Sequence, residues 1–223
     1  MDSVMPIGII LAVIAFMVFS YVTSKKRREA LLLWASERGW RLRTHGGNDR
    51  YKDFPFLKLF DQGQSRKSSN VIDGDLAGLP LVLMDYQFVT GSGKSRTTHH
   101  RGLVILKLPH PVIPMSIRRE NVFDKVGEFL GGGDIDFESA EFSRKFHVTS
   151  SDRKWAYDVI HTRTMDYLLS APSHNVCFGG HEIAIIKNGH FNSDNYDEAI
   201  AMATTLHELI PDYVVQQMKG TSP

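Results

Sequence analysis

The residues best suited to chemistry in this sequence form a short glycine- and serine-rich string, Thr90-Gly-Ser-Gly-Lys-Ser95. A phosphate-binding loop needs Gly-x4-Gly-Lys-Ser/Thr between a strand and a helix whose N-terminal N–H groups face the phosphates. The first glycine of that pattern would fall at position 88, which is Phe88, and the segment that follows has the pattern of a strand. The string therefore predicts a hairpin loop and no nucleotide site.

Two adjacent histidines, His99 and His100, follow that loop and are candidates for metal binding. Neighbouring residues on a strand point to opposite faces, so both rings cannot reach one ion from the same side. No cysteine and no acidic residue at ligand spacing accompanies them. The other histidines form neither His-x3-His nor His-Glu-x-x-His. We expect solvated or edge-strand histidines.

Four acidic residues in the second half of the chain could supply a general acid and base or a cation site: Asp134, Asp136, Glu138 and Glu141. No nucleophile motif flanks them, and acids at the start of a helix are expected from the helix dipole alone. The sequence therefore predicts no catalytic, cofactor-binding or metal-binding residue.

The most distinctive segment runs from Val4 to Val22: nineteen uncharged residues, of which eleven are Ile, Leu, Val or Phe. As a helix they would span about 28 Å, close to the hydrocarbon thickness of about 30 Å. A signal peptide instead carries positive charge before a shorter apolar run, and a small-residue cleavage site after it. A core helix would not be apolar on every face. We predict a transmembrane anchor within residues 1–24.

A basic tetrad follows the apolar run: Lys25, Lys26, Arg27 and Arg28. Basic residues beside a membrane span stay on the cytoplasmic side, so the N-terminus is predicted outside the plasma membrane and the rest of the chain in the cytoplasm. The tetrad is also predicted to attract anionic lipid, by about 1 kcal/mol per residue near the surface. The predicted partners are the bilayer and another membrane or cytoplasmic protein. A net charge of +1 does not favour nucleic acid.

The rest of the chain is predicted to hold a juxtamembrane helix over residues 25–39, one domain over residues 40–219 and a tail over 220–223. Gly131-Gly132-Gly133 could be a joint between lobes, after a helix over 121–130. The single cysteine, Cys177, excludes an internal disulfide. The predicted fold class is α+β, with an antiparallel-rich sheet packed by short helices.

Alternating apolar residues and turn residues place the strands and helices of that domain. Residues 62–70 are predicted to be a polar loop. We expect Pro114 to put the strand of residues 113–117 near a sheet edge. Gly179-Gly180 predicts a hairpin. The predicted strands cover 71–76, 79–88, 103–106, 113–117, 176–179 and 183–187, and the main later helices begin near 152, 162 and 193.

The most regularly patterned part of the chain is the block from Asp134 to Leu169. We expect it to be mainly a packing signature, with its basic residues Arg144, Lys145 and Arg153 outward. The inward positions are Phe142, Phe146, Val148, Trp155, Ala156, Met165 and Leu168.

Three patterns together carry a resemblance to a known family. They are the turn Asn70-Val-x-Asp-Gly74, the strand Met84-Asp-Tyr86, and the block Glu138-Ser139…Glu141-Phe142…Phe146-x-Val148…Asp152…Ala156…Arg163-x-Met165…Leu168-Leu169. The chain resembles an uncharacterised bacterial family of single-pass membrane-anchored proteins carrying a domain of unknown function. Ser143 stands where that family often has Asn. The resemblance implies this architecture and location, and it names no site.

These observations favour a membrane-anchored, non-catalytic interaction or regulatory domain at the cytoplasmic face of the plasma membrane. Two alternatives remain open. One is a membrane-proximal enzyme, either a hydrolase or a transferase, and the other is a sensor of a lipid or small ligand.

Overall fold

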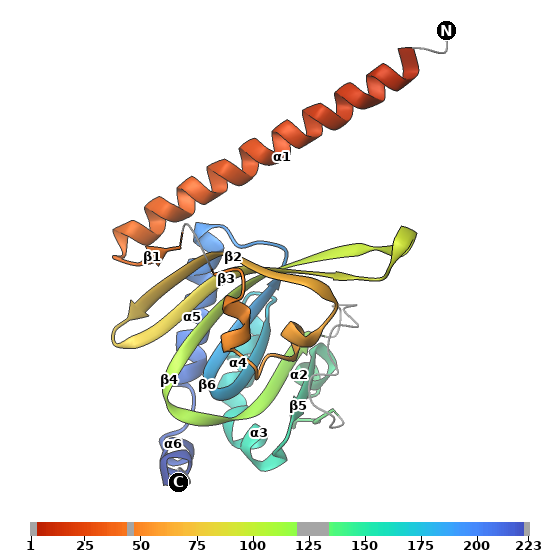
Figure 1. Ribbon diagram of the computed structural model, residues 1–223. Helices are drawn as coiled ribbons and strands as arrows, with labels where there is room; N and C mark the ends of the chain where they lie inside the picture. The colour runs from red at the N-terminus through yellow and green to blue at the C-terminus, as the bar shows by residue number, and fades with distance from the viewer. Residues whose placement is uncertain (1–3, 44–46, 120–133, 221–223) are drawn as a thin grey trace.

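The computed structural model describes residues 4–43, 47–119 and 134–220, and these form an α+β fold. The described strands make one antiparallel sheet in the order β1-β2-β3-β4-β5, and β6 pairs with the other side of β4 (Figure 1). The strands are β1 (Arg41–Leu42), β2 (Gln64–Leu76), β3 (Leu79–Thr90), β4 (Thr97–Arg119), β5 (Phe146–Ser150) and β6 (Asn175–Asn188). The predicted fold class is therefore confirmed as α+β with an antiparallel sheet.

Strand β3 separates two hydrophobic cores, because its side chains alternate between the two faces of the sheet. Leu81 and Leu83 belong to the core under the helices, and Val82 and Met84 belong to the core on the opposite face. Cys177 likewise lies in the core opposite to that of its two neighbours.

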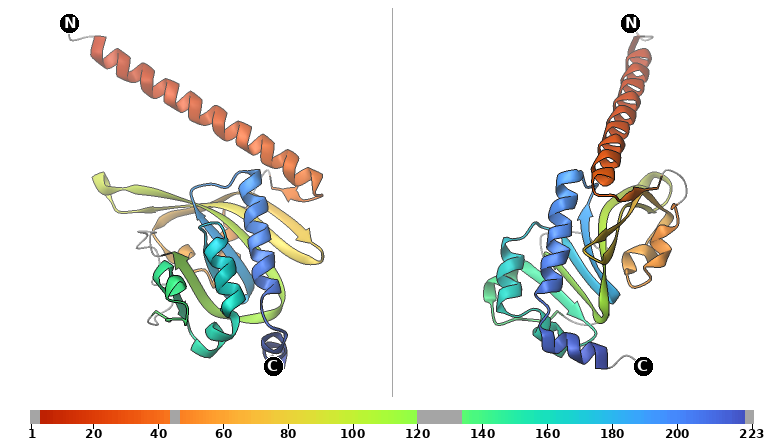
Figure 2. Two further views of the ribbon diagram at one scale, coloured as in Figure 1. Left: turned by 180° about the vertical axis from the view of Figure 1, so that it is seen from behind. Right: turned by 90° about the vertical axis from the view of Figure 1, so that its left-hand side faces the viewer.

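Helices cover one face of the sheet, and the short 3₁₀ turns η1 (Arg50–Asp53) and η2 (Lys58–Asp61) cover the other (Figure 2). The helices of the domain are α2 (Ala140–Lys145), α3 (Arg153–Val159), α4 (Thr162–Ser170), α5 (Ser193–Glu208) and α6 (Asp212–Gly220). The Asp152 side chain caps α3, and the Asn192 side chain caps α5.

The prediction of a polar loop over residues 62–70 was wrong from Gln64 onward, where β2 begins. Strand β2 starts at Gln64, which pairs with Val89 of β3, and the ladder continues through Lys67. These polar residues extend because β3 offers them backbone hydrogen bonds, a force that a hydrophobicity pattern does not record.

Two further predictions about strands were wrong. Residues 113–117 belong to the long strand β4, whose segment 115–117 lies between β5 and β6, so Pro114 does not mark an edge. The ladder between β4 and β6 changes register between Lys107 and Met115, and this irregularity accommodates the prolines. The predicted hairpin at Gly179-Gly180 is also absent, because β6 is continuous there. A Cβ on Gly179 would lie 2.7 Å from the Phe56 ring, so this glycine serves close packing.

Helix α1 (Val4–Glu37) leaves the domain as a long rod, and the described contacts of its side chains with the domain lie in its C-terminal third, from Arg27 onward (Figure 1). Leu31, Trp34 and Ala35 are buried there. Gly39, at φ +70°, follows the helix in the left-handed conformation that commonly ends one.

No helix in the part of the chain that the structure describes is long and apolar enough to cross a membrane. The predicted anchor falls in part on residues 4–10 and 12, whose side chains lie outside the described set. The predicted helix over 121–130 and the glycine joint at 131–133 also lie outside the described residues, as do residues 221–223 of the predicted tail.

Candidate functional site

A buried carboxylate joins α1 to the sheet. Asp85, on the helix-covered face of β3, is only 2% exposed. Arg27 of α1 donates two hydrogen bonds to this carboxylate, from Nη1 to Oδ2 at 2.7 Å and from Nη2 to Oδ1 at 2.9 Å. The Arg27 Nε also donates to the Phe191 carbonyl at 2.7 Å. This bidentate geometry is the strongest arrangement of an arginine and a carboxylate. Its two hydrogen bonds set the orientation of α1 relative to β3, in addition to the attraction of the charges.

Asn70 and His190 complete the site. We call the four residues Arg27, Asn70, Asp85 and His190 the Asp85 node. The Asn70 amide donates to Asp85 Oδ2 at 2.7 Å, and His190 Nδ1 lies 3.2 Å from Oδ1. Asn70 has φ +47° and lies where the pairing of β2 with β3 is irregular, a conformation that asparagine tolerates better than most residues.

The node is closed by an aromatic ring that a glycine admits. Gly102 pairs with Asp85 across β3 and β4, and a Cβ on it would lie 2.4 Å from the Phe191 ring. Because Gly102 has no side chain, Phe191 packs directly on the sheet. The ring also packs against Tyr196 of α5, with centroids 4.9 Å apart. Tyr196 in turn stacks on Trp34 of α1, with centroids 5.7 Å apart, so this packing connects the loop between β6 and α5 to the docked part of α1.

The charges of the node reinforce each other. Burial is the largest influence on Asp85 and raises its pKa, but the hydrogen bonds from His190, Arg27 and Asn70 together outweigh it, so the pKa lies below its ordinary value. Burial, followed by the negative charge of Asp85, raises the pKa of Tyr196 well above its ordinary value. Asp85 is therefore ionised and Tyr196 neutral at physiological pH.

Acid should weaken the fold through Asp85. A carboxyl whose folded pKa lies below its unfolded value of about 3.8 contributes stability that is fully present above that pH. That stability is lost as the pH falls through the folded pKa. We expect the difference in unfolding free energy between the wild type and Asp85→Asn to shrink as the pH falls below about 4. Chemical denaturation at a series of pH values measures it.

His174 and His207 also make the fold sensitive to acid, but their pKa values do not depend on Asp85. Burial lowers the pKa of His100, and the negative charge of Asp85 acts against this effect, so the comparison is made below about pH 5. Burial lowers the pKa of His174 and of His207, so both weaken the fold as the pH drops below about 6.5. Both are present in both proteins, and their contributions cancel in the difference. A difference that stays constant down to pH 2 would contradict the ionised node.

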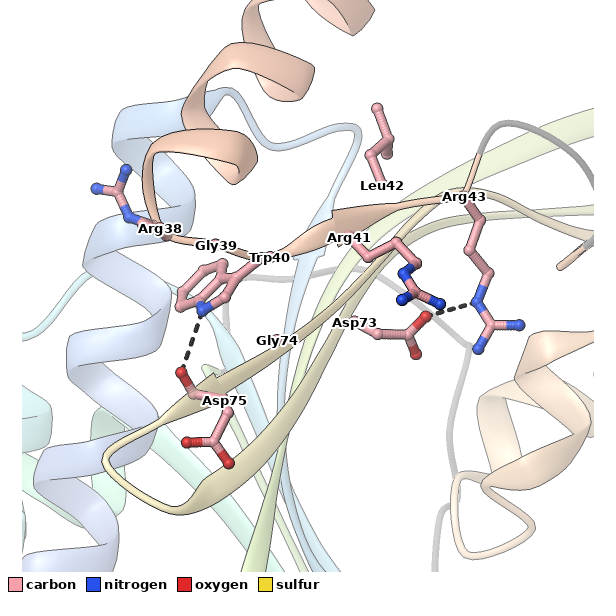
Figure 3. Close-up of a pocket in the computed structure, with 9 residues that line it drawn as sticks. All are labelled: Arg38, Gly39, Trp40, Arg41, Leu42, Arg43, Asp73, Gly74 and Asp75. Atoms are coloured by element: carbon pink, nitrogen blue, oxygen red, sulfur yellow. Dashed lines mark hydrogen bonds and ion pairs between the residues drawn. The ribbon is translucent and has the colours of Figure 1, made fainter.

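An open cleft lies where α1 ends and β1 begins (Figure 3). Its volume is about 1010 Å³. The Trp40 ring packs on Gly74 of β2, where a Cβ would lie 2.7 Å from it, and the indole Nε1 donates to the Asp75 carbonyl at 3.1 Å. The lining residues are Arg38, Gly39, Trp40, Arg41, Leu42, Arg43, Asp73, Gly74 and Asp75.

Guanidinium groups gather around one carboxylate of this cleft. Arg41 and Arg43 both point toward Asp73, with Arg43 Nε 2.5 Å from its Oδ2 (Figure 3). Arg38 lies over the Trp34 ring at 4.4 Å and pairs with Asp197 of α5 at 3.0 Å. Guanidiniums, carboxylates and an exposed indole edge suit the binding of a polar or anionic group through charge-assisted hydrogen bonds.

The structure divides the basic tetrad that the sequence singles out. Arg27 turns inward to the node, with 22% of its side chain exposed. Lys25, Lys26 and Arg28 are exposed, and Lys25 lies 4.0 Å from Glu29. A contact of the tetrad with a membrane surface stays a prediction.

The other sequence candidates do not converge on the node or the cleft. His99 stacks on Phe88 at 4.8 Å, and His100 lies 4.9 Å from His190 on the opposite face of β4, so the predicted divergence of the two rings is confirmed. The glycine–serine string forms the tip of the β3–β4 hairpin, as predicted.

The acidic cluster is mostly engaged in local structure. Asp134 accepts hydrogen bonds from the backbone of Ile135 and Val148, and Glu141 pairs with Lys145 at 2.7 Å. Asp136 and Glu138 line a second cleft of about 540 Å³ near α3 and α4. No group of three or more potential metal ligands occurs within residues 4–43, 47–119 and 134–220.

The Asp85 node was not predicted from the sequence as a site. Asn70 and Asp85 were singled out there only as members of the patterns shared with a family, and Arg27 only as one charge of four. One signal was present: Asp85 interrupts an apolar strand, and a carboxylate in such a place must find a partner.

Comparison with known proteins supports the fold. No protein-family model matches the chain, and no curated protein matches it. Among solved structures, the chain is similar to the crystal structure of the mycobacterial trehalose monomycolate transport factor A. The TM-score is 0.59 at 12% identity, over 83% of this chain and 96% of that one. At that identity the likeness concerns the fold alone.

Proposed function

We propose that this chain is a membrane-anchored accessory protein of lipid transport, which acts through protein contacts at the cytoplasmic face of the plasma membrane. Residues 4–22 cross the bilayer with the N-terminus outside, and Lys25, Lys26 and Arg28 lie at the inner surface. The observation that carries the proposal is the Asp85 node, because it fastens a helix with an apolar first half to the centre of the sheet.

The exposure of α1 supports its place in a membrane. Leu11, Phe16 and Phe19 are 60%, 71% and 70% exposed, on a helix whose described residues up to Lys26 are all exposed. Large apolar side chains on every face of a helix are unfavourable in water, and hydrocarbon is the surrounding that suits them. The node then sets the direction in which the domain leaves the bilayer.

A role in contacts with other proteins agrees with the chemistry of the junction. The node stabilises the docking of α1, since its hydrogen bonds hold a helix, a strand and a loop together. The fold is shared with a protein described as a transport factor, which supports an accessory role. The partner that we propose is another membrane protein, reached by the domain beside its own anchor.

A second candidate function is the sensing of a small polar or anionic ligand. The cleft at the junction of α1 and β1 favours it, because Arg41 and Arg43 flank Asp73 next to the Trp40 ring (Figure 3). A ligand in this cleft would contact β1, which directly follows α1, so its binding could alter how α1 leaves the domain.

Two charges in the apolar half of α1 should release the protein from membranes. An arginine at the centre of a span costs about 2.5–3.5 kcal/mol, so Val13→Arg with Val18→Arg costs about 6 kcal/mol. We expect the wild type to stay in the pellet when cell membranes are washed with alkaline carbonate, and the double variant to move to the supernatant. Ser36→Arg, exposed on the docked end of α1, is the matched control and should stay in the pellet.

The same cells test the orientation and the role. Burial raises the pKa of Cys177 to about 12, so this thiol reacts poorly and an introduced cysteine takes the label. Ser3→Cys should react with an impermeant maleimide in intact cells, and Gln216→Cys only after lysis. Export of newly made envelope lipid should fall in cells that carry only the double-arginine variant. Retention of that variant in the carbonate pellet, or unchanged export, would overturn the proposal.

A further inference from the structure

The β3–β4 hairpin extends beyond the rest of the sheet as a two-stranded ribbon, which we define as residues 90–99. Gln64 of β2 pairs with Val89, and Asn188 of β6 pairs with Arg101, so the ribbon lies past both neighbouring strands. Its own strands pair from Thr90 with Thr97 inward. An isolated two-stranded ribbon is marginal in water, so a ribbon of this kind benefits from a surface to rest on.

Hydrogen bonds and close backbone contacts nevertheless fix the conformation of the ribbon. Its tip turns through the 3₁₀ segment η3 (Gly93–Ser95), where the Ser95 N–H donates to the Ser92 carbonyl at 3.1 Å. Gly91 has φ +73°, and a Cβ on it would lie 2.3 Å from the Ser95 carbonyl oxygen. At the base, Thr90 Oγ1 and His99 Nε2 are 2.7 Å apart. The tip is therefore held in one shape.

The charge of the ribbon is positive only. No aspartate or glutamate occurs in the sequence from Tyr86 to Arg119. Residues 91–98 are all exposed, and within the described part of the chain Lys94 and Arg96 have no ion-pair partner. The remaining tip residues are glycine, serine and threonine, which offer hydroxyl and backbone N–H groups and no apolar wedge. Such a surface suits phosphate groups that are approached without insertion into hydrocarbon.

The ribbon also lies on the side of the domain toward which α1 extends. In two opposite views it projects from the sheet in the direction of the N-terminal part of that helix (Figures 1 and 2). Helix α6 lies at the far end of the domain (Figure 1). A bilayer crossed by the first half of α1 would therefore meet the ribbon before it met α6.

From these observations we infer that the ribbon is a second membrane contact, which binds the anionic phospholipid headgroups of the inner leaflet through Lys94 and Arg96. The inference rests on the proposed function, since α1 brings the ribbon to the bilayer. Together with Lys25, Lys26 and Arg28, the ribbon gives the domain two basic contacts that limit its swing about the anchor. Each basic residue near an anionic surface contributes about fivefold, the equivalent of about 1 kcal/mol.

The test uses the full chain in lipid vesicles with a spin label at the tip, as Ser95→Cys. Vesicles of phosphatidylcholine are compared with vesicles that also contain phosphatidylglycerol, and the accessibility of the label to an aqueous nickel chelate is measured. We expect the tip label to become severalfold less accessible when phosphatidylglycerol is present. A label at Gln216→Cys on α6 is the positional control and should not change.

A charge control separates local contact from general attraction. Lys94→Gln with Arg96→Gln should reduce the fraction of chains whose tip label is protected by about an order of magnitude. Raised salt should also reduce this fraction. Lys107→Gln with Lys219→Gln removes the same charge from exposed positions away from the tip, and should have little effect.

The outcomes distinguish the two proposals. A chain that stays in the vesicles while its tip label is equally accessible in both lipids overturns the ribbon contact and leaves the anchor intact. A chain that the vesicles do not retain overturns both. A tip that is protected only after another protein is added identifies the ribbon as a protein-binding surface and overturns the lipid assignment.

Discussion

Replacing Asp85 by alanine is expected to lower the free energy of unfolding by about 3 kcal/mol. Removing one partner of a buried ion pair commonly costs about 3–5 kcal/mol, because the other partner is left without its hydrogen bonds. The lower end applies here, since Arg27 keeps 22% of its side chain exposed and can turn toward water. For a chain of this size the loss corresponds to a melting temperature about 10 °C lower. Thermal unfolding of the full chain in detergent measures it.

A double variant separates the cost of leaving Arg27 without its partner from the loss of the ion pair itself. Arg27→Met with Asp85→Leu replaces the pair by apolar groups of similar volume, a change that is often neutral, and it should restore most of the stability. Asp49→Ala is the surface control, because its pair with Lys52 is exposed and worth less than about 1 kcal/mol. If Asp85→Ala melts like the wild type, the node does not hold α1 to the sheet.

Hydrogen exchange gives a second measurement on the same variant. The amides of α1 near Leu31 and Ala35 should exchange faster in Asp85→Ala, because the helix end loses the bond that orients it. The amides of β3 near Leu83 should change less, since that strand keeps both of its neighbours in the sheet.

The parts of the fold that the sequence predicts are those set by local periodicity. Alternation assigns Val82 and Met84 to one face of β3 and Leu83 to the other, and the structure confirms it. The docked end of α1 is predictable for the same reason, because Leu31, Trp34 and Ala35 lie on one stripe before Gly39. Each of these signals is contained within a few residues.

The parts that the sequence does not predict depend on contacts between distant segments. Gln64 to Asn70 form a strand because β3 lies beside them, and Gly179 sits within β6 because the Phe56 ring packs against it. The Asp85 node joins Arg27, Asn70 and His190, which are separated by up to 163 positions in the sequence. Asp85 in an apolar strand indicates that a partner exists, but only the folded chain identifies Arg27.

Truncating Phe142 to alanine is the second substitution for which we expect a large effect, about 3–5 kcal/mol of unfolding free energy. The ring is fully buried, stacks on Phe146 with centroids 4.7 Å apart, and meets Phe137 edge-on at 5.4 Å. Its removal would leave a cavity lined by the two remaining rings, and a domain with only about 5–15 kcal/mol in hand would be seriously weakened. The midpoint of denaturant unfolding measures the loss.

The comparison with Arg153→Ala decides what the block from Asp134 to Leu169 does. Arg153 is exposed and donates one long hydrogen bond, at 3.3 Å, to the Asp134 carbonyl, so its loss should change stability by less than about 0.5 kcal/mol. A packing block predicts a large effect for Phe142 and almost none for Arg153. If Phe142→Ala unfolds like the wild type but loses a bound protein, the ring is accessible to that protein and the block is an interaction surface. The complete burial of the Phe142 ring favours a loss of stability, which is the result expected of a packing block.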